Sequence, residues 1–171
     1  MNQPQEPTKT LCIIRHAKSD QNLFVKDFDR PLNDRGKHDA PMMAQRLKLQ
    51  VPQLEAFVSS PANRARSTAE FFAAAYDALP GRLMLKDDLY HATEMQFYEV
   101  IESLPQQISS AALFSHNPGI TEFINSLSPR IHLDNMPTCG VFVIQIFSNE
   151  WSDFETARKK FLFFDYPKKP Q

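Results

Sequence analysis

Two histidines and two arginines occur where apolar, strand-like runs of the sequence end. Arg15 and His16 follow the run LCII, and His116 follows ALFS. Arg64 lies four residues after the run EAFVSS, in the first turn of an expected helix. A neutral imidazole can attack phosphorus at pH 7, because its ordinary pKa is about 6.5, and guanidinium groups match the oxygens of a phosphoryl group. A second imidazole can donate a hydrogen bond to that group or transfer a proton. These side chains indicate phosphoryl chemistry, provided that the fold brings them together.

Each of these residues taken alone also has a purely structural interpretation. A histidine at a strand end is commonly a hydrogen-bonded structural residue, and Arg15 could belong to a buried ion pair. Arg64 could be an ordinary solvated side chain, and the nearby Arg66 is a competing choice. The coincidence of all four at the ends of strands favours a site.

The elements that must position these residues follow from the alternation of apolar runs with helix-like segments. This alternation predicts an α/β sheet with helices on both faces. We expect strands near 10–15, 55–60, 83–85, 110–115, 140–147 and 160–166, and helices within 33–50, 60–77, 93–104 and 117–127. Ligands of open α/β sheets bind outside the carboxyl ends of the strands. If the strands that precede His16, Arg64 and His116 are neighbours, the four side chains converge there.

Helix starts are predicted from capping patterns. Ser60 is expected to be an N-cap with Pro61 at the first helical position, and Thr93 with Gln96 fits a capping box. Asn117 is expected to cap the helix that follows His116. Helix N-termini after Ser60 and Asn117 would add positive partial charge to the site, which makes Asn117 a candidate for phosphate binding. The aromatic C-terminal stretch FLFFDYPKKPQ is expected to be a core strand rather than a dimer edge.

Composition excludes several classes of function. The net charge is −1, so no basic field points to nucleic acid, and no run of 18 apolar residues predicts a membrane span. The chain has only four glycines and neither a P-loop nor GxGxxG, so side chains must bind any phosphate. Cys12 and Cys139 lack CxxC spacing and are expected to be free thiols in a reducing cytoplasm.

The five histidines show no spacing typical of a metal site. They contain no HxxxH or HxH pair, so we expect neither a metal nor another cofactor. Residues 1–9 are polar and contain prolines, which predicts a flexible lead-in to a single domain over 10–167.

Three of these segments resemble motifs of a known family. LCIIRHAKS, SSPANRARSTAE and FSHNPGI resemble the Arg-His, Ser-Pro-x-x-Arg-Ala and second-histidine motifs of the histidine phosphatase superfamily, which includes the phosphoglycerate mutases. The spacing, with DFDRPLNDRG and LYHAT between them, is similar to that of the SixA-type phosphohistidine phosphatases, and the resemblance spans about 10–166. It implies a three-layer α/β/α sandwich with a mixed, mostly parallel six-stranded sheet.

The resemblance also implies roles for the site residues. His16 would be the nucleophile that carries the phosphoryl group and later releases it to water. Arg15, Arg64 and His116 would bind and stabilise that group, and the family uses no metal for this chemistry. Ser19 and Asn22 fall at positions that contact phosphate in the mutases.

The sequence departs from the mutase pattern in three ways. Ala17 replaces the commoner glycine after the Arg-His pair, and Lys18 stands where the mutases usually carry Glu. The mutases also keep a glutamate acid in a long segment before the second histidine, and here only 55 residues separate Ser60 from His116. Glu94 and His91 are the possible general acids, although Glu94 also fits an ordinary charge in the first turn of a helix.

The scarcity of acids bears on the substrate. An alkoxide leaving group needs a proton from a positioned acid, whereas imidazole is a much weaker base and needs less help. We therefore predict a phosphatase acting on phosphohistidine in another protein. A small-molecule phosphatase for a sugar phosphate or nucleotide is one alternative, and a non-catalytic phosphate-binding module is another. A mutase is disfavoured because no segment predicts a lid that would keep water from its intermediate.

Overall fold

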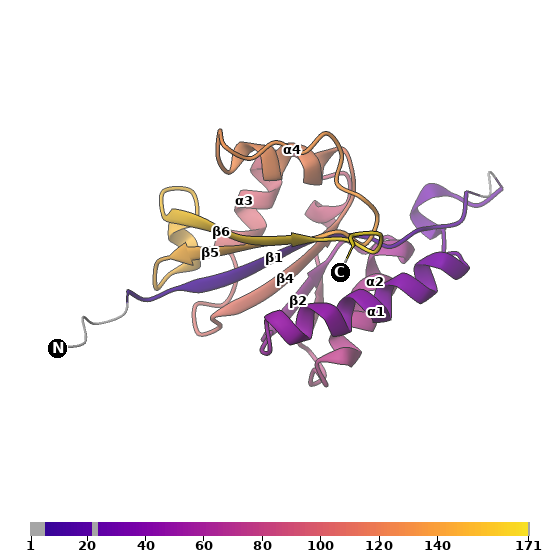
Figure 1. The fold of residues 1–171 in the computed structure, drawn as a ribbon, viewed down its shortest axis with the longest axis horizontal. Coiled ribbons are helices and arrows are strands. Elements are labelled where there is room, and N and C mark those ends of the chain that lie inside the picture. The colour runs from indigo at the N-terminus through magenta and orange to yellow at the C-terminus, as the bar shows by residue number, and fades with distance from the viewer. Residues whose placement is uncertain (1–5, 22–23, 171) are drawn as a thin grey trace.

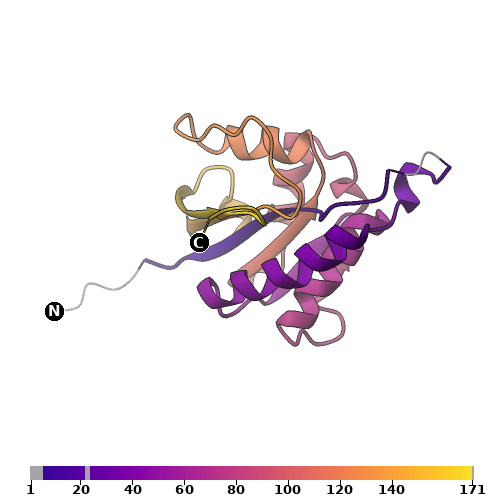
Figure 2. The same cartoon turned by 45° about the vertical axis from the view of Figure 1, so that its right-hand side comes forward.

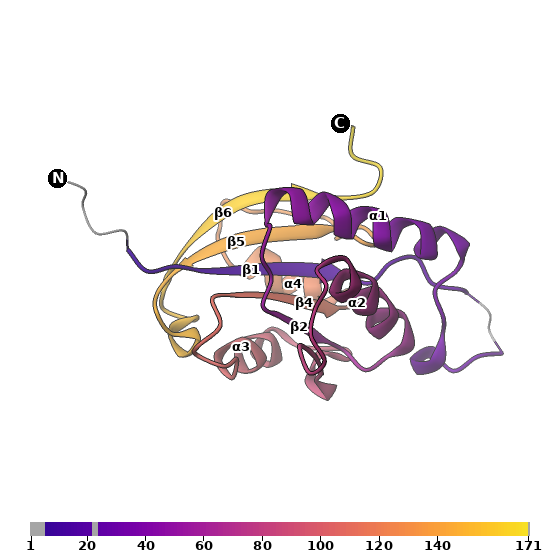
Figure 3. The same cartoon turned by 90° about the horizontal axis from the view of Figure 1, so that it is seen from below.

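The sheet has six strands, as predicted. The computed structural model describes residues 6–21 and 24–170. The strands are β1 (Lys9–Arg15), β2 (Ala56–Ser59), β3 (Leu83–Leu85), β4 (Ser110–Ser115), β5 (Val141–Phe147) and β6 (Arg158–Asp165). Their order is β3-β2-β4-β1-β5-β6, and Figure 3 shows β2, β4, β1, β5 and β6 side by side in this order. The four strands from β3 to β1 are parallel, and β5 runs antiparallel to both of its neighbours. The predicted mixed, mostly parallel sheet is confirmed.

Two pairs of helices cover the two faces of the sheet. Helices α1 (Asp34–Gln50) and α2 (Asn63–Ala75) lie on one face, and α3 (Glu94–Glu102) and α4 (Gly119–Ser126) on the other (Figures 1 and 2). The described residues also form three short 3-10 helices: η1 (Asp27–Asp29), η2 (Asp87–Leu89) and η3 (Trp151–Asp153). The result is an α/β/α sandwich.

Strand β1 separates two hydrophobic cores. Leu11 and Ile13 pack in the core on the side of α3 and α4, while Cys12 and Ile14 pack in the core on the side of α1 and α2. This alternation follows from the two-residue period of a strand that is buried on both faces. Cys12 and Cys139 are buried free thiols, as expected.

The strand order brings the expected strand ends together. β4 pairs with β1 on one side and with β2 on the other, and Arg15 lies beside Ser115 in the β1–β4 register. Because these strands are parallel, their carboxyl ends meet at one edge of the sheet. The residues that follow β1, β2 and β4 therefore share that edge.

Two of the predicted helix starts are wrong. Helix α2 begins at Asn63 without a side-chain cap, because Ser60 and Pro61 form a turn in which the Ser60 hydroxyl accepts the Ala62 N–H at 3.3 Å. Helix α4 begins at Gly119 with Pro118 as its N-cap, so Asn117 does not cap it.

The capping box of α3 is confirmed. The Thr93 side chain accepts the Gln96 N–H, and the Gln96 side chain accepts the Thr93 N–H. These two hydrogen bonds fix the start of α3, directly after the segment that carries Tyr90 and His91.

The C-terminal aromatic segment is not the core strand that we expected. β6 is the last strand of the sheet, and Phe161 and Leu162 are 47% and 38% exposed. It has a neighbouring strand on one side only, so aromatic content alone was a poor guide to its burial. No helix in the described ranges combines the length and apolarity that a membrane span requires.

Candidate active site

The nucleophile candidate, His16, lies directly after β1 and is only 6% exposed. Its Nδ1 is 2.7 Å from the Ala17 carbonyl oxygen, which can only accept, so Nδ1 carries the ring proton. Arg64 Nε lies 3.3 Å from His16 Nε2 and donates to it. The lone pair of Nε2 is thereby directed toward the guanidinium group of Arg64.

His16 is held in its neutral form. Burial lowers its pKa most strongly, the Ala17 carbonyl opposes this, and the charges of Arg64, Arg15 and Arg30 lower it further, to about 3. At pH 7 the imidazole is unprotonated at Nε2, which is the state that a nucleophile requires.

His116 faces His16 from the end of β4. The two ring centroids are 5.1 Å apart, and His116 Nε2 lies 2.7 Å from the Ser60 hydroxyl oxygen. Because that oxygen already accepts the Ala62 N–H, its own hydrogen can be donated to Nε2, which leaves the proton of the neutral ring on Nδ1. Burial, followed by the neighbouring His16 and Arg64, lowers the pKa of His116 to about 2.

Arg64 forms the third side of this cluster and is 2% exposed. Its Nη1 donates to the backbone oxygen of Asp27 at 2.6 Å, and its Nη2 donates to Asp27 Oδ2 at 3.0 Å. Arg66, the competing choice, points to solvent and pairs with Glu70 at 3.6 Å, with 47% of its side chain exposed. The structure thus places Arg64, and not Arg66, beside the histidines.

Arg15 approaches the cluster from the end of β1. Its Nη1 donates to the Met136 carbonyl at 2.7 Å, and burial together with the charge of Arg64 lowers its pKa. Within the described ranges, the buried side-chain nitrogens that lack a hydrogen-bond partner are Arg15 Nε, Arg30 Nε and His116 Nδ1. Buried polar groups are normally paired, and an anion beside the arginines and His116 would pair with them.

His16, His116 and Arg64 form the buried floor of the site. Asp27, Tyr90 and His91 lie beside this floor and form a rim. Asp27 of η1 accepts hydrogen bonds from Tyr90 Oη at 2.8 Å and pairs with Arg30 Nη2 at 2.9 Å. His91 Nε2 lies 3.6 Å from Asp27 Oδ2, and the His91 ring lies 6.0 Å from that of His116. The rim is more exposed than the floor, with 46% of the Asp27 side chain and 58% of the His91 side chain exposed.

Sequence reasoning missed Asp27, Tyr90 and Arg30. All three lie in segments, DFDRPLNDRG and LYHAT, that had been used only for their spacing. The signal in the sequence was the carboxylate of Asp27, which lies three residues before Arg30 and soon after the expected nucleophile, His16.

The described contacts of Asn117 and Ser19 do not join either side chain to the clustered histidines and arginines. Asn117 donates to the Met136 carbonyl at 3.0 Å and accepts from Thr121 Oγ1 at 2.6 Å, so its side chain supports the segment to which Arg15 is bonded. Ser19 is buried, and its described contacts are those of its backbone, which bridges to Leu32 and accepts from Asn33. Asn22 lies outside the described residues.

The two acid candidates differ in their positions. His91 lies on the rim, whereas Glu94 lines a surface groove together with Tyr98 and Glu102. None of the described contacts joins Glu94 to the histidines. Within residues 6–21 and 24–170, no group of three His, Cys, Asp or Glu side chains is arranged to hold a metal ion.

The comparison with known families decides what this site belongs to. The model of the histidine phosphatase superfamily (branch 1) matches residues 11–132. The chain belongs to the histidine phosphatase superfamily. The matched region contains all four of the clustered side chains.

Two solved structures share the fold of this chain. A protein assigned as the phosphohistidine phosphatase SixA of Nakamurella multipartitia has a TM-score of 0.80 at 21% identity, covering 95% of this chain and 98% of that one. A mycobacterial glucosyl-3-phosphoglycerate phosphatase has a TM-score of 0.65 at 16% identity, covering 90% and 97%. At such identities the likeness shows the fold alone.

Among curated sequences, an uncharacterised protein of Mycobacterium tuberculosis is 26% identical over 165 residues, which cover 91% of this chain and all of that protein. A phosphatase is the coarse function that the family and the fold support.

Proposed function

We propose that this chain is a metal-independent phosphatase that carries the phosphoryl group on His16 and removes it from phosphohistidine in another protein. The observation that carries the proposal is the unprotonated Nε2 of His16 directed at Arg64 on a buried floor. His116, which belongs to this floor, and Arg15 beside it contribute nitrogens that have no partner among the described residues. We also propose a reducing, cytoplasmic location, in keeping with the two free thiols.

The first step transfers the phosphoryl group to the protein. The lone pair of His16 Nε2, which accepts Arg64 Nε–H before substrate binds, turns to phosphorus and attacks it. The P–N bond of the substrate breaks, and its electron pair stays on the ring nitrogen. Because the other ring nitrogen of the substrate carries a proton, the ring departs as neutral imidazole. Arg15 and Arg64 stabilise the charge on the phosphoryl oxygens, and His116 Nδ1–H donates to one of them. Such preorganised charge stabilisation usually contributes more to catalysis than any other single effect.

The second step returns the protein to its starting state. Water attacks phosphorus, the bond between phosphorus and His16 Nε2 breaks, and the electron pair returns to Nε2 while the proton of water leaves with phosphate or to solvent. His16 departs as a neutral imidazole, because Nδ1 keeps its proton on the Ala17 carbonyl throughout. This step therefore needs no strong acid.

Phosphohistidine is favoured as substrate because its leaving group needs little acid catalysis. Glu94, one of the two acid candidates, lies on a different surface groove. His91 on the rim could protonate an alkoxide, so a small phosphate ester is the second candidate substrate.

The test compares wild type with His16→Ala on a phosphohistidine carrier protein and on p-nitrophenyl phosphate, without added metal. We expect phosphate release to fall by at least about a thousandfold in the variant on both substrates. His132→Ala, at an imidazole that is 80% exposed and pairs with Asp134, is the matched control and should retain full activity.

The outcomes separate the proposals. Faster turnover of the carrier protein supports protein phosphohistidine, and turnover of the ester alone moves the substrate to small molecules. A His16→Ala variant that retains activity removes His16 as the nucleophile. Saturable phosphate binding without turnover by wild type indicates a binding module.

A further inference from the structure

The site is layered, so that a phosphoryl group and the rest of its substrate meet different residues. The floor of His16, His116 and Arg64 is at most 6% exposed. Any molecule whose phosphoryl group reaches this floor must place its leaving group beside the more exposed rim. The carboxylate of Asp27 on that rim therefore acts on the leaving group.

Asp27 lies close to the nucleophile. A single guanidinium group, that of Arg64, separates them, with Nε at 3.3 Å from His16 Nε2 and Nη2 at 3.0 Å from Asp27 Oδ2. The backbone oxygen of Asp27 also holds Arg64 Nη1 at 2.6 Å, so η1 is anchored to the floor. The carboxylate is thus held beside the place where the leaving group must lie.

The neighbours of Asp27 favour its ionised form. Burial raises its pKa, but the hydrogen bonds from Tyr90 and Arg64 and the charges of Arg64 and Arg30 outweigh this and lower it to about 2. Among the described contacts, Oδ1 receives only Arg30, while Arg64, Tyr90 and His91 all lie at Oδ2. A carboxylate oxygen can accept two hydrogen bonds, so Oδ1 can accept another donor.

We propose that Asp27 makes the site selective for phosphorylated imidazoles, because its carboxylate accepts the ring N–H of the leaving group and repels leaving groups that depart as oxyanions. This proposal rests on the proposed function of His16. It assigns to Asp27 a role in substrate choice in addition to its contact with Arg64.

The chemistry follows from the two nitrogens of the substrate ring. One nitrogen bears phosphorus, and the other is protonated when the ring is cationic. A carboxylate that accepts this N–H stabilises the cationic ring, whose P–N bond is weaker because the ring then departs as neutral imidazole with the electron pair of the broken bond. A phenolate or alkoxide instead develops negative charge beside the same carboxylate, which is unfavourable.

The test uses two small probes, N-phosphoimidazole and p-nitrophenyl phosphate, so that protein docking plays no part. In Asp27→Asn we expect kcat/KM for N-phosphoimidazole to fall about tenfold to a hundredfold, the range of a lost hydrogen bond to a charged group. For p-nitrophenyl phosphate we expect kcat/KM to stay the same or to rise. A residue that merely holds Arg64 would lower both values by the same factor.

Two further variants sharpen the result. Asp29→Asn, in the same 3-10 helix, removes an exposed carboxylate. The contact of Asp29 with α2 uses its backbone oxygen, which accepts from the Asn63 side chain and is kept in the variant. This variant should change kcat/KM for neither probe. Tyr90→Phe removes one hydrogen bond to Asp27 and keeps the charge, so the ratio of the two values should stay near that of wild type.

Every outcome decides the proposal. An equal loss on both probes, no loss on N-phosphoimidazole, or a larger loss on the ester overturns the role of Asp27. None of these results bears on His16, whose own failure would appear as activity retained by His16→Ala.

Discussion

At the scale of single residues, the site depends on keeping two imidazoles neutral within a cationic pocket. The pKa values of His16 and His116 are lowered to about 3 and about 2, chiefly by burial. Neutral rings cost less to bury than charged ones, and they retain the lone pair that attacks phosphorus. The same property makes the fold sensitive to acid.

We predict that the free energy of unfolding falls as the pH is lowered from 7 to 5. Below about pH 6.5 the histidines of the unfolded chain bind protons that the buried His16 and His116 do not bind, so acid favours unfolding. The contribution of the two neutral histidines to the free energy of unfolding is fully present above about pH 6.5 and is lost progressively as the pH falls toward 3. Down to pH 5 the loss should be about 2 to 4 kcal/mol for the two residues.

Urea unfolding at several pH values measures this loss. The pH range of 5 to 7 lies above the titration of ordinary carboxyl groups, whose pKa values are about 4. His116→Asn should have a clearly shallower pH dependence than wild type. An unchanged slope in this variant would show that His116 titrates normally in the folded protein.

At the scale of elements, the rim is positioned by the contact between α4 and the segment before α3. Gly119, at the start of α4, lies so close to Ala92 that a Cβ would overlap the Ala92 carbonyl oxygen. Ala92 directly follows Tyr90 and His91 of the rim. Glycine at 119 therefore permits the close packing that places those side chains over His116.

We predict that Gly119→Ala lowers the free energy of unfolding by about 2 kcal/mol or more, because backbone atoms rather than a flexible side chain must move to relieve the overlap. Urea unfolding measures the change. Glu122→Ala, at an exposed position of the same helix, should stay within about 0.5 kcal/mol of wild type. If the two variants are equally stable, the backbone around Ala92 can move away from the new methyl group without loss of stability.

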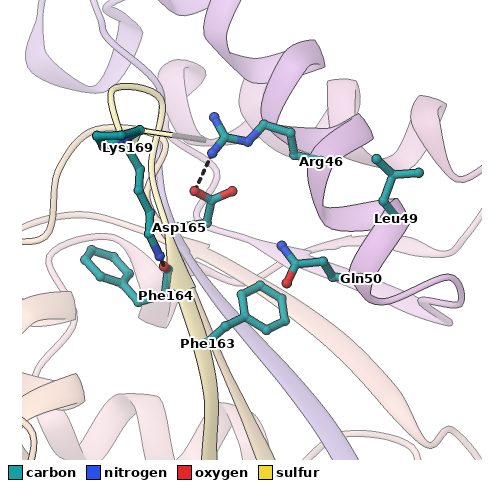
Figure 4. Close-up of a pocket in the computed structure, with 8 residues that line it drawn as sticks. Arg46, Leu49, Gln50, Phe163, Phe164, Asp165 and Lys169 are labelled. Carbon is teal, nitrogen blue, oxygen red and sulfur yellow. Dashed lines mark hydrogen bonds and ion pairs between the residues drawn. The ribbon is translucent and has the colours of Figure 1, made fainter.

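At the scale of the whole molecule, the edge strand β6 is joined to a helix far from it in the sequence. Arg46 of α1 donates to Asp165, the last residue of β6, at 2.5 Å. Figure 4 marks this contact with a dashed line. The two side chains are 18% and 10% exposed. The pair therefore links α1 to the β6 edge of the sheet.

We predict that Asp165→Asn destabilises the protein by about 1 to 3 kcal/mol, less than a fully buried pair because solvent screens it in part. The exposed pair of Lys48 with Asp77, in which 90% of the Asp77 side chain is accessible, is the control. Asp77→Asn should cost at most about 0.5 kcal/mol in the same urea titrations. A similar cost for both variants would mean that burial adds nothing to the α1–β6 pair.

Local sequence patterns predicted those features that depend on near neighbours in the chain. Strands such as β4 are continuous apolar runs, and the capping box of α3 needs only Thr93 and Gln96. The predicted caps at Ser60 and Asn117 failed because tertiary contacts recruited both side chains, Ser60 to His116 and Asn117 to Met136.

The sequence by itself determined the class of fold and the four side chains that cluster at the carboxyl ends of β1, β2 and β4. These side chains could be found because polar residues directly after apolar runs can be recognised in the sequence without the structure. Only the tertiary structure placed Asp27, Tyr90 and His91 over them. The rim joins η1 to a segment more than 60 residues later in the chain, at Tyr90. Such a contact has no local pattern, since it depends on how the helices of both faces pack against the sheet.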